Sequence, residues 1–139
     1  MNEETRELIR YRLAEARETL SDSEDLLRKG SVRSAANRTY YAMFYATLAV
    51  LATRNLSSSK HTGVIGLLHR EFVKPGIFPK ELAEALDRAF NLRGSSDYRE
   101  FVIPEKEAVM VLLDRARAFV SKAEELTAEN EGRKQEPGS

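Results

Sequence analysis

Apolar residues recur along this chain at intervals of three and four positions, which is the spacing of an amphipathic α-helix. The strict alternation of apolar and polar residues that indicates a half-buried β-strand is absent from the sequence. The helical spacing appears in five segments, at about residues 2–29, 31–55, 61–73, 79–94 and 104–128. The pattern therefore predicts a single all-α domain of about five helices, of which the third is short.

The second segment is apolar over most of its circumference. One of its faces carries Asn37, Tyr41, Phe44, Tyr45, Leu48 and Leu51, and that face is widened by Ala36, Tyr40, Met43 and Val50. A helix that is apolar nearly all round is usually enclosed by other helices. We therefore expect this helix to lie at the centre of a bundle.

Glycine, proline and a change of composition mark the expected ends of the helices. Gly30 and Gly94 favour helix ends, and Pro79 and Pro104 favour helix starts. After Ala128 the sequence is too polar to pack against a core. These signals predict one domain over residues 1–128 and a disordered polar tail over residues 129–139.

Composition narrows the possible settings and functions. The 139 residues include no cysteine, which excludes disulfides and thiolate metal sites and suits a reducing compartment. No apolar run approaches the roughly 20 residues of a membrane span, and the first residues are acidic and polar, so we expect a cytoplasmic protein without a membrane anchor. The formal net charge is 22 − 22 = 0, which argues against a protein that coats nucleic acid generally but leaves room for a local basic site.

Arg93 is the most informative single residue. It follows Phe90 by three positions and Ala89 by four, so it projects from the buried face of its helix. A buried guanidinium needs a partner. One interpretation pairs Arg93 with Asp97 at the end of the helix, and the other directs it into a cleft where it holds a phosphate through two hydrogen bonds.

Three further polar positions could carry chemistry. Asn37 shares a helix face with Tyr40 and Tyr41, whose hydroxyl groups are candidate partners for a buried amide. His61 and His69 are eight residues apart, about 12 Å along a helix, so they cannot share a metal ion and no metal or cofactor site is expected. We interpret His61, which follows Lys60, as a neutral surface residue at a helix start, and His69 as a partly exposed residue.

Three segments, taken in order, resemble one protein family. They are the run Ser-Ala-Ala-Asn-Arg-Thr-Tyr-Tyr-Ala-Met-Phe at 34–44, the run Ser-Lys-His-Thr-Gly-Val at 59–64 followed by Phe-Val at 72–73, and the run Arg-Gly-Ser-Ser-Asp-Tyr at 93–98. Their order and spacing resemble the HEPN superfamily, and within it the small helical proteins called UPF0332, over about residues 8–126.

The resemblance implies an up-down bundle with a four-helix core and one short helix, paired as a homodimer. It implies a minimal nucleotidyltransferase partner in a toxin–antitoxin-like pair. Active HEPN ribonucleases use an Arg-x(4–6)-His motif, doubled across the dimer, to cut RNA without metal through the ribose 2′-hydroxyl. Only Arg93 matches that motif here, because Tyr98 stands at the expected histidine position and no histidine follows Arg93.

The leading hypothesis is therefore a HEPN protein, non-catalytic or weakly active, that binds a nucleotidyltransferase partner and a nucleotide or RNA phosphate. The ligand-binding residues would be Asn37, Arg38, Tyr41, Lys60, Arg93 and Asp97. One alternative is a metal-independent endoribonuclease toxin in which Arg93 acts with His61 or Tyr98. Another is a structural homodimer without a ligand. In relatives paired with a nucleotidyltransferase, a tyrosine near this motif can accept AMP, which makes Tyr98 a candidate acceptor.

Overall fold

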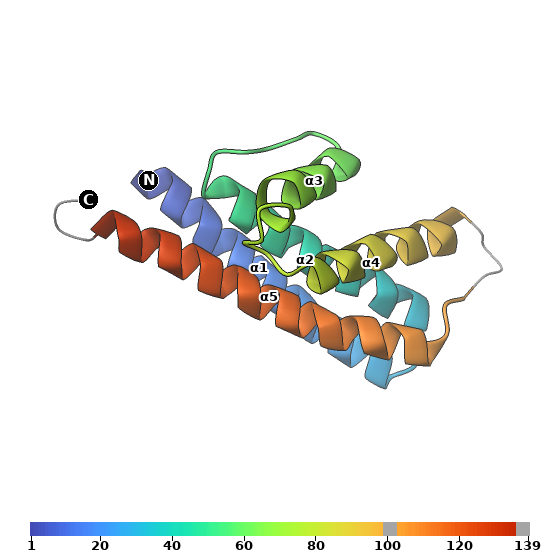
Figure 1. Cartoon of the computed structure of the whole chain (residues 1–139). Helices are drawn as coiled ribbons and strands as arrows, with labels where there is room; N and C mark the ends of the chain where they lie inside the picture. Colours follow the sequence, from blue (N-terminus) through green and yellow to red (C-terminus); the bar gives the residue numbers. More distant parts are fainter. Residues whose placement is uncertain (99–102, 136–139) are drawn as a thin grey trace.

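A computed structural model describes the backbone of residues 1–98 and 103–135, and the side chains within residues 1–93 and 103–130. The described residues form five α-helices: α1 (Glu3–Arg28), α2 (Val32–Ala52), α3 (His61–Leu68), α4 (Lys80–Tyr98) and α5 (Lys106–Gln135). A π-helical turn, His69–Val73, extends α3. The described residues contain no strand, and the predicted all-α class is confirmed. Figure 1 shows the long helices α1, α2, α4 and α5 running up and down beside one another, with the short α3 packed against α2.

Helix α2 is central to the bundle, as its apolar circumference predicts. It packs against α1, α3, α4 and α5. Tyr40 and Met43 are fully buried among these neighbours. The surrounding helices leave one half-buried stripe along α2, formed by Asn37, Arg38, Tyr41, Tyr45 and Leu48. This stripe determines which α2 side chains can reach a ligand.

The turn between α1 and α2 follows the predicted signal at Gly30. Gly30 has a φ of 85°, which glycine adopts without the steric cost that a side chain would bring. Its N–H donates to the carbonyl of Leu27 at 3.1 Å, and the N–H of Ser31 donates to that of Leu26 at 2.8 Å. These bonds satisfy carbonyl groups at the end of α1 and reverse the chain, so that α2 runs back along α1.

Two predicted helix ends are wrong. The sequence places the end of α4 at Gly94, but the helix continues to Tyr98. One glycine costs a helix only about 1 kcal/mol relative to alanine, which a helix that is already nucleated tolerates. The sequence also ends α5 near Ala128, whereas the helix continues to Gln135 through residues that are mostly good helix formers. The rest of the predicted tail, residues 136–139, lies outside the described residues.

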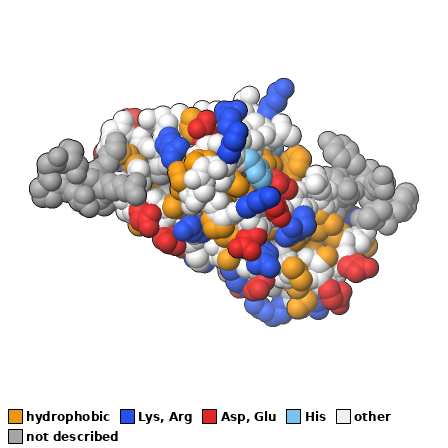
Figure 2. Space-filling view, in the orientation of Figure 1, with side chains coloured by type: hydrophobic (Ala, Val, Ile, Leu, Met, Phe, Trp, Pro, Cys, Tyr) orange, Lys and Arg blue, Asp and Glu red, His pale blue; other side chains and the backbone are white. Residues whose placement is uncertain are grey.

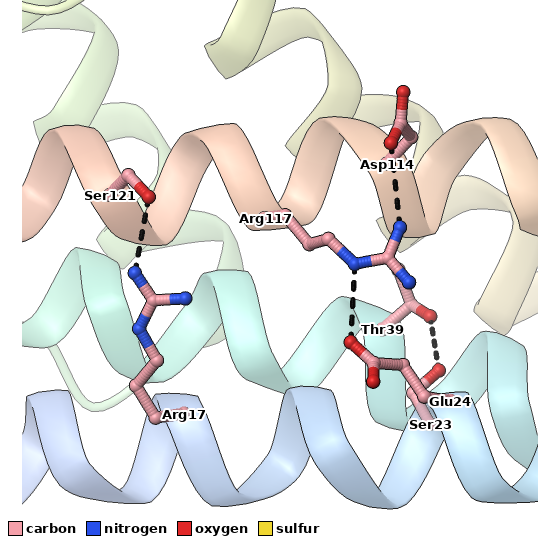
Figure 3. Close-up of polar contacts among 7 residues, drawn as sticks. All are labelled: Arg17, Ser23, Glu24, Thr39, Asp114, Arg117 and Ser121. Carbon is pink, nitrogen blue, oxygen red and sulfur yellow. Dashed lines mark hydrogen bonds and ion pairs between the residues drawn. The ribbon is translucent and has the colours of Figure 1, made fainter.

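Polar contacts connect α1 to its two neighbours (Figure 3). The guanidinium of Arg117 on α5 donates to Glu24 on α1 at 3.1 Å and to Asp114 at 3.4 Å. In the core, the hydroxyl groups of Ser23 and Thr39 lie 2.7 Å apart and join α1 to α2. The exposed ion pair contributes little stability because water screens it, whereas the buried hydroxyl pair satisfies groups that water cannot reach.

The surface carries charges of both signs. In Figure 2, basic and acidic side chains are interspersed with apolar ones over the face shown, in agreement with a formal net charge of zero. Within residues 1–98 and 103–135, no helix is long and apolar enough to cross a membrane.

Candidate functional site

A cluster of aromatic rings holds His61 against α2. His61 is the first residue of α3, and its imidazole stacks on the ring of Phe44 with centroids 4.2 Å apart and planes at 20°. The ring of Tyr41 lies edge-on to it at 5.8 Å. The Nδ1 atom of His61 lies 2.7 Å from the hydroxyl oxygen of Tyr40. The prediction of a surface residue at a helix start is therefore wrong in part, because His61 begins the helix but is half-buried against aromatic residues.

The loop before α3 fixes the position of His61. A Cβ atom added to Gly63 would lie 2.0 Å from Oγ and 2.8 Å from Cβ of Ser58, so the loop touches the first turn of α3 directly. The Ser58 hydroxyl also accepts a hydrogen bond from the backbone N–H of Lys60 at 3.3 Å. Lys60 directly precedes His61 and Gly63 follows it by two residues, so the loop contacts the chain on both sides of His61.

Two arginine side chains approach the same tyrosine. The guanidinium carbon of Arg93, from α4, lies 5.4 Å from the ring centre of Tyr40 and 5.5 Å from that of Tyr41. Its Nη2 donates a long hydrogen bond of 3.5 Å to the hydroxyl of Tyr41. The guanidinium carbon of Arg38, on α2, lies 5.1 Å from the Tyr41 ring centre, and its Nη2 donates to Oδ1 of Asn37 at 3.0 Å. We call Arg38, Tyr40, Tyr41, His61 and Arg93 the arginine–aromatic site.

Burial and the charge of Arg93 set the protonation states in this site. Loss of hydration lowers the pKa of His61, and the nearby charge of Arg93 lowers it further. Burial raises the pKa of Tyr40 well above its usual range, an effect that Arg93 opposes and Tyr41 reinforces. At neutral pH, therefore, His61 is uncharged and Tyr40 keeps its proton. The positive charge of the site comes from its arginine residues.

Acidic residues of α1 lie across a groove from Arg38. A groove of about 360 Å³ between α1 and α2 is lined by Glu15, Glu18 and Asp22 on one side and by Arg38 on the other. The three carboxylates on the α1 side disfavour an anionic ligand there. In the part of the chain that the structure describes, no three His, Asp or Glu side chains are grouped so that they could hold a metal ion.

The structure gathers some of the predicted ligand-binding residues and separates others. Arg93, Tyr41, Arg38 and His61 lie together in the arginine–aromatic site. Asn37 joins them through Arg38, and the expectation that tyrosine hydroxyls bind its amide is wrong because those hydroxyls face His61 and Arg93. Lys60 precedes His61 and is exposed. The side chains of Asp97 and Tyr98 lie outside the described residues, so the pairing of Arg93 with Asp97 and the predicted roles of both side chains stay predictions.

His69 is not part of the arginine–aromatic site. Nε2 of His69 lies 3.0 Å from a carboxylate oxygen of Asp87, which connects the π-helical turn to α4. About a third of the His69 side chain is exposed, as the sequence predicts.

Sequence reasoning did not identify Tyr40 and Phe44 as the partners of His61. These two residues are four positions apart on α2, so one side chain follows the other on the same face. That spacing is also what a purely structural core stripe requires. Only the packing of α3 on α2 shows that Tyr40 and Phe44 contact His61 and are not simply part of the core.

Comparisons with known proteins identify relatives over most of the chain. The family model of the HEPN domain matches residues 9–126. A "UPF0332 protein" of Thermotoga maritima is 42% identical over 126 residues, which cover 91% of this chain and 95% of that protein. Two proteins of Methanocaldococcus jannaschii, named "Putative toxin MJ0142" and "Putative toxin MJ0605", are each 33% identical; the alignments cover 79% and 88% of this chain, and 75% and 90% of those proteins.

Proposed function

The chain belongs to the HEPN domain family, and we propose that it is the toxin-type member of a toxin–antitoxin pair and binds a phosphate group of RNA or of a nucleotide at Arg38 and Arg93. The match over residues 9–126 and the two relatives named as candidate toxins support the first part of this proposal. The geometry of the arginine–aromatic site supports the second part.

The observation that carries the phosphate site is the approach of two guanidinium groups to one tyrosine ring. Both guanidinium carbons lie within 5.5 Å of the centre of Tyr41. The electron-rich ring attracts both cations, and both bring N–H donors close to the same side chain. A phosphate group with several acceptor oxygens would neutralise both charges and could accept paired N–H bonds from each guanidinium. An anion therefore suits the site better than a neutral or cationic ligand.

The proposal extends to the proteins that this chain binds. We propose a homodimer and a minimal nucleotidyltransferase as antitoxin partner, both of which rest on the family resemblance. The half-buried Tyr45 and Leu48 on α2 offer apolar surface for a protein contact. Light scattering at micromolar concentration should give twice the 15.7 kDa mass of one chain. A monomeric mass across that range would contradict the dimer.

Titration calorimetry with 5′-AMP and with a short RNA tests the phosphate site. Arg93→Ala and Arg38→Ala should each weaken binding about tenfold to a hundredfold, since a hydrogen bond to a charged group contributes about 1.5–3 kcal/mol. Arg88→Ala is a matched control, because Arg88 is an exposed arginine of the same helix that lines a different groove. If the Arg93 and Arg38 variants bind both ligands as the unaltered protein does, the proposed site is wrong.

A second candidate function is metal-independent cleavage of RNA. It is favoured by the position of His61, whose pKa responds to the charge of Arg93 although the two residues come from different helices. In this function Arg93 would stabilise the pentavalent phosphorus and His61 would move the proton. Cleavage of a labelled RNA in the presence of EDTA, lost in both Arg93→Ala and His61→Ala, would establish it. Intact RNA under the same conditions would exclude it and favour the binding function.

A further inference from the structure

The hydrogen bond between Tyr40 and His61 has a direction that the surroundings determine. The Tyr40 side chain has no exposed surface, so water does not reach its hydroxyl group. Among the residues that the structure describes, Nδ1 of His61 is the hydrogen-bond partner of that hydroxyl. Burial also keeps Tyr40 protonated, so the hydroxyl has a proton to donate in a hydrogen bond.

Only one arrangement satisfies both groups. If Nδ1 of His61 carried the proton and donated to Tyr40, the tyrosine proton would point into the apolar core without an acceptor. Buried donors without an acceptor are rare because they cost free energy. If Tyr40 donates to Nδ1 instead, both groups are satisfied, and the proton of the neutral imidazole must lie on Nε2.

We propose that Tyr40 is a positioning residue that holds His61 as the neutral tautomer with its proton on Nε2, and that this N–H donates to a phosphate oxygen bound at Arg93. The inference rests on the proposed phosphate site. Within the described residues, Nε2 has no hydrogen-bond partner, and His61 is only half-buried, so a ligand can reach this atom. Among the described side chains, the charged and titratable groups around the imidazole are Tyr40 and Tyr41 of α2, Arg93 of α4 and the preceding Lys60.

This assignment decides what His61 can do at neutral pH. A nitrogen that carries a proton cannot accept another from a ribose hydroxyl, and Nδ1 already accepts the hydrogen bond from Tyr40. His61 is therefore a poor general base in this state but a good uncharged donor. Arg93 neutralises the charge of the phosphate, and the hydrogen bond from His61 orients it. The tautomer thus favours binding over cleavage of RNA.

Nitrogen NMR of the uniformly ¹⁵N-labelled full chain tests the tautomer without any ligand. At pH 7.5 we expect His61 to show a protonated Nε2 and an unprotonated, hydrogen-bonded Nδ1. Tyr40→Phe removes the hydroxyl and should shift the Nδ1 resonance. Tyr41→Phe is the control, because its hydroxyl bonds Arg93 and should leave that resonance in place. A protonated Nδ1 in the unaltered protein, or an Nδ1 resonance unmoved by Tyr40→Phe, would overturn the assignment.

Binding of 5′-AMP at pH 7.5 tests the donor role. His61→Gln keeps an N–H donor near the position of Nε2 and should bind within about twofold of the unaltered chain, while His61→Leu should lose roughly threefold to tenfold, the worth of one neutral hydrogen bond. If His61→Leu binds normally while Arg93→Ala does not, the donor role of His61 is wrong and the phosphate site stands. If neither substitution affects binding, the proposed phosphate site fails, and the donor role fails with it.

Discussion

Replacing Gly63 by alanine tests whether the loop before α3 fixes the candidate site. A Cβ atom at this position would lie 2.0 Å from Oγ of Ser58 and 2.8 Å from its Cβ. The hydroxyl can rotate away, but the Cβ of Ser58 moves only with its backbone. The loop, the first turn of α3, or both must therefore shift, and His61 lies in that turn.

Two opposing effects determine how much Gly63→Ala changes the free energy of unfolding. Alanine is favoured over glycine inside a helix by about 1 kcal/mol. Overpacking a tight contact typically costs about 1–3 kcal/mol. Gly66 lies in the same helix with nothing within 4 Å of its added Cβ, so it is the matched control. Gly66→Ala should stabilise the protein by about 1 kcal/mol, and Gly63→Ala should be less stable than Gly66→Ala by about 1–3 kcal/mol.

Urea unfolding monitored by circular dichroism measures this difference. Ser58→Gly removes both clashing atoms, so adding Gly63→Ala to that background should restore the gain of about 1 kcal/mol expected for a helical alanine. The double-mutant cycle then reports the contact itself. The Nδ1 resonance of His61 should move in Gly63→Ala and stay in place in Gly66→Ala. If Gly63→Ala is as stable as Gly66→Ala, the loop does not press on α3 and does not position His61.

Three other predictions test the core, the pH response and the candidate acceptor. The pKa of His61 is lowered on folding, so the unfolded chain binds the proton more readily; the free energy of unfolding should fall as pH drops below about 6.5, the unfolded pKa. His61→Gln should remove that part of the pH dependence in urea titrations. Thr39→Val leaves Ser23 without one of its partners and should cost about 1–2 kcal/mol in the same measurement; no loss would show that the hydroxyl pair is not stabilising. A nucleotidyltransferase partner should add AMP to the chain but not to a Tyr98→Phe variant, as read by mass spectrometry, and equal labelling of both would exclude Tyr98 as acceptor.

The helices could be predicted from sequence because their burial repeats with the helical period, but two of their ends could not. Buried positions such as Ala16, Leu20 and Leu27 on α1 follow that period directly. The end of a helix depends on differences of about 1 kcal/mol per residue, which an established helix overrides. Gly94 and the polar residues after Ala128 therefore indicated ends that the chain does not adopt.

The candidate site could be predicted only where one helix determines it. The inward direction of Arg93 follows from its spacing to Ala89 and Phe90. Its contact with Tyr41 joins positions 52 residues apart, and the contact of His61 with Tyr40 joins positions 21 residues apart. Both contacts depend on how α2, α3 and α4 pack together. No local period encodes that packing, so the sequence alone predicts a surface position for His61.

Because the site spans three helices, ligand binding should stabilise the docking of α3. Helix α3 has only eight residues, and an isolated helix of that length is not stable in water. Its order therefore depends on its packing in the bundle, through the buried Val64 and Leu68 and the contact of His61 with α2, and on the loop at Ser58. A phosphate that bridges Arg93 and His61 would bind the docked state and not the open one. At a ligand concentration 100 times Kd, such linkage stabilises the docked state of α3 relative to the open state by about 2.7 kcal/mol.

Hydrogen exchange can measure that linkage. Amides of α3 that exchange through local opening should slow by up to about a hundredfold at this concentration of 5′-AMP. Amides in the first turn of α1, which does not contact α3, provide the internal control. Arg93→Ala should abolish the protection together with binding. Unchanged exchange of α3 at saturating ligand, in a protein whose binding still requires Arg93, would show that the phosphate does not contact α3 and that His61 is not part of the site.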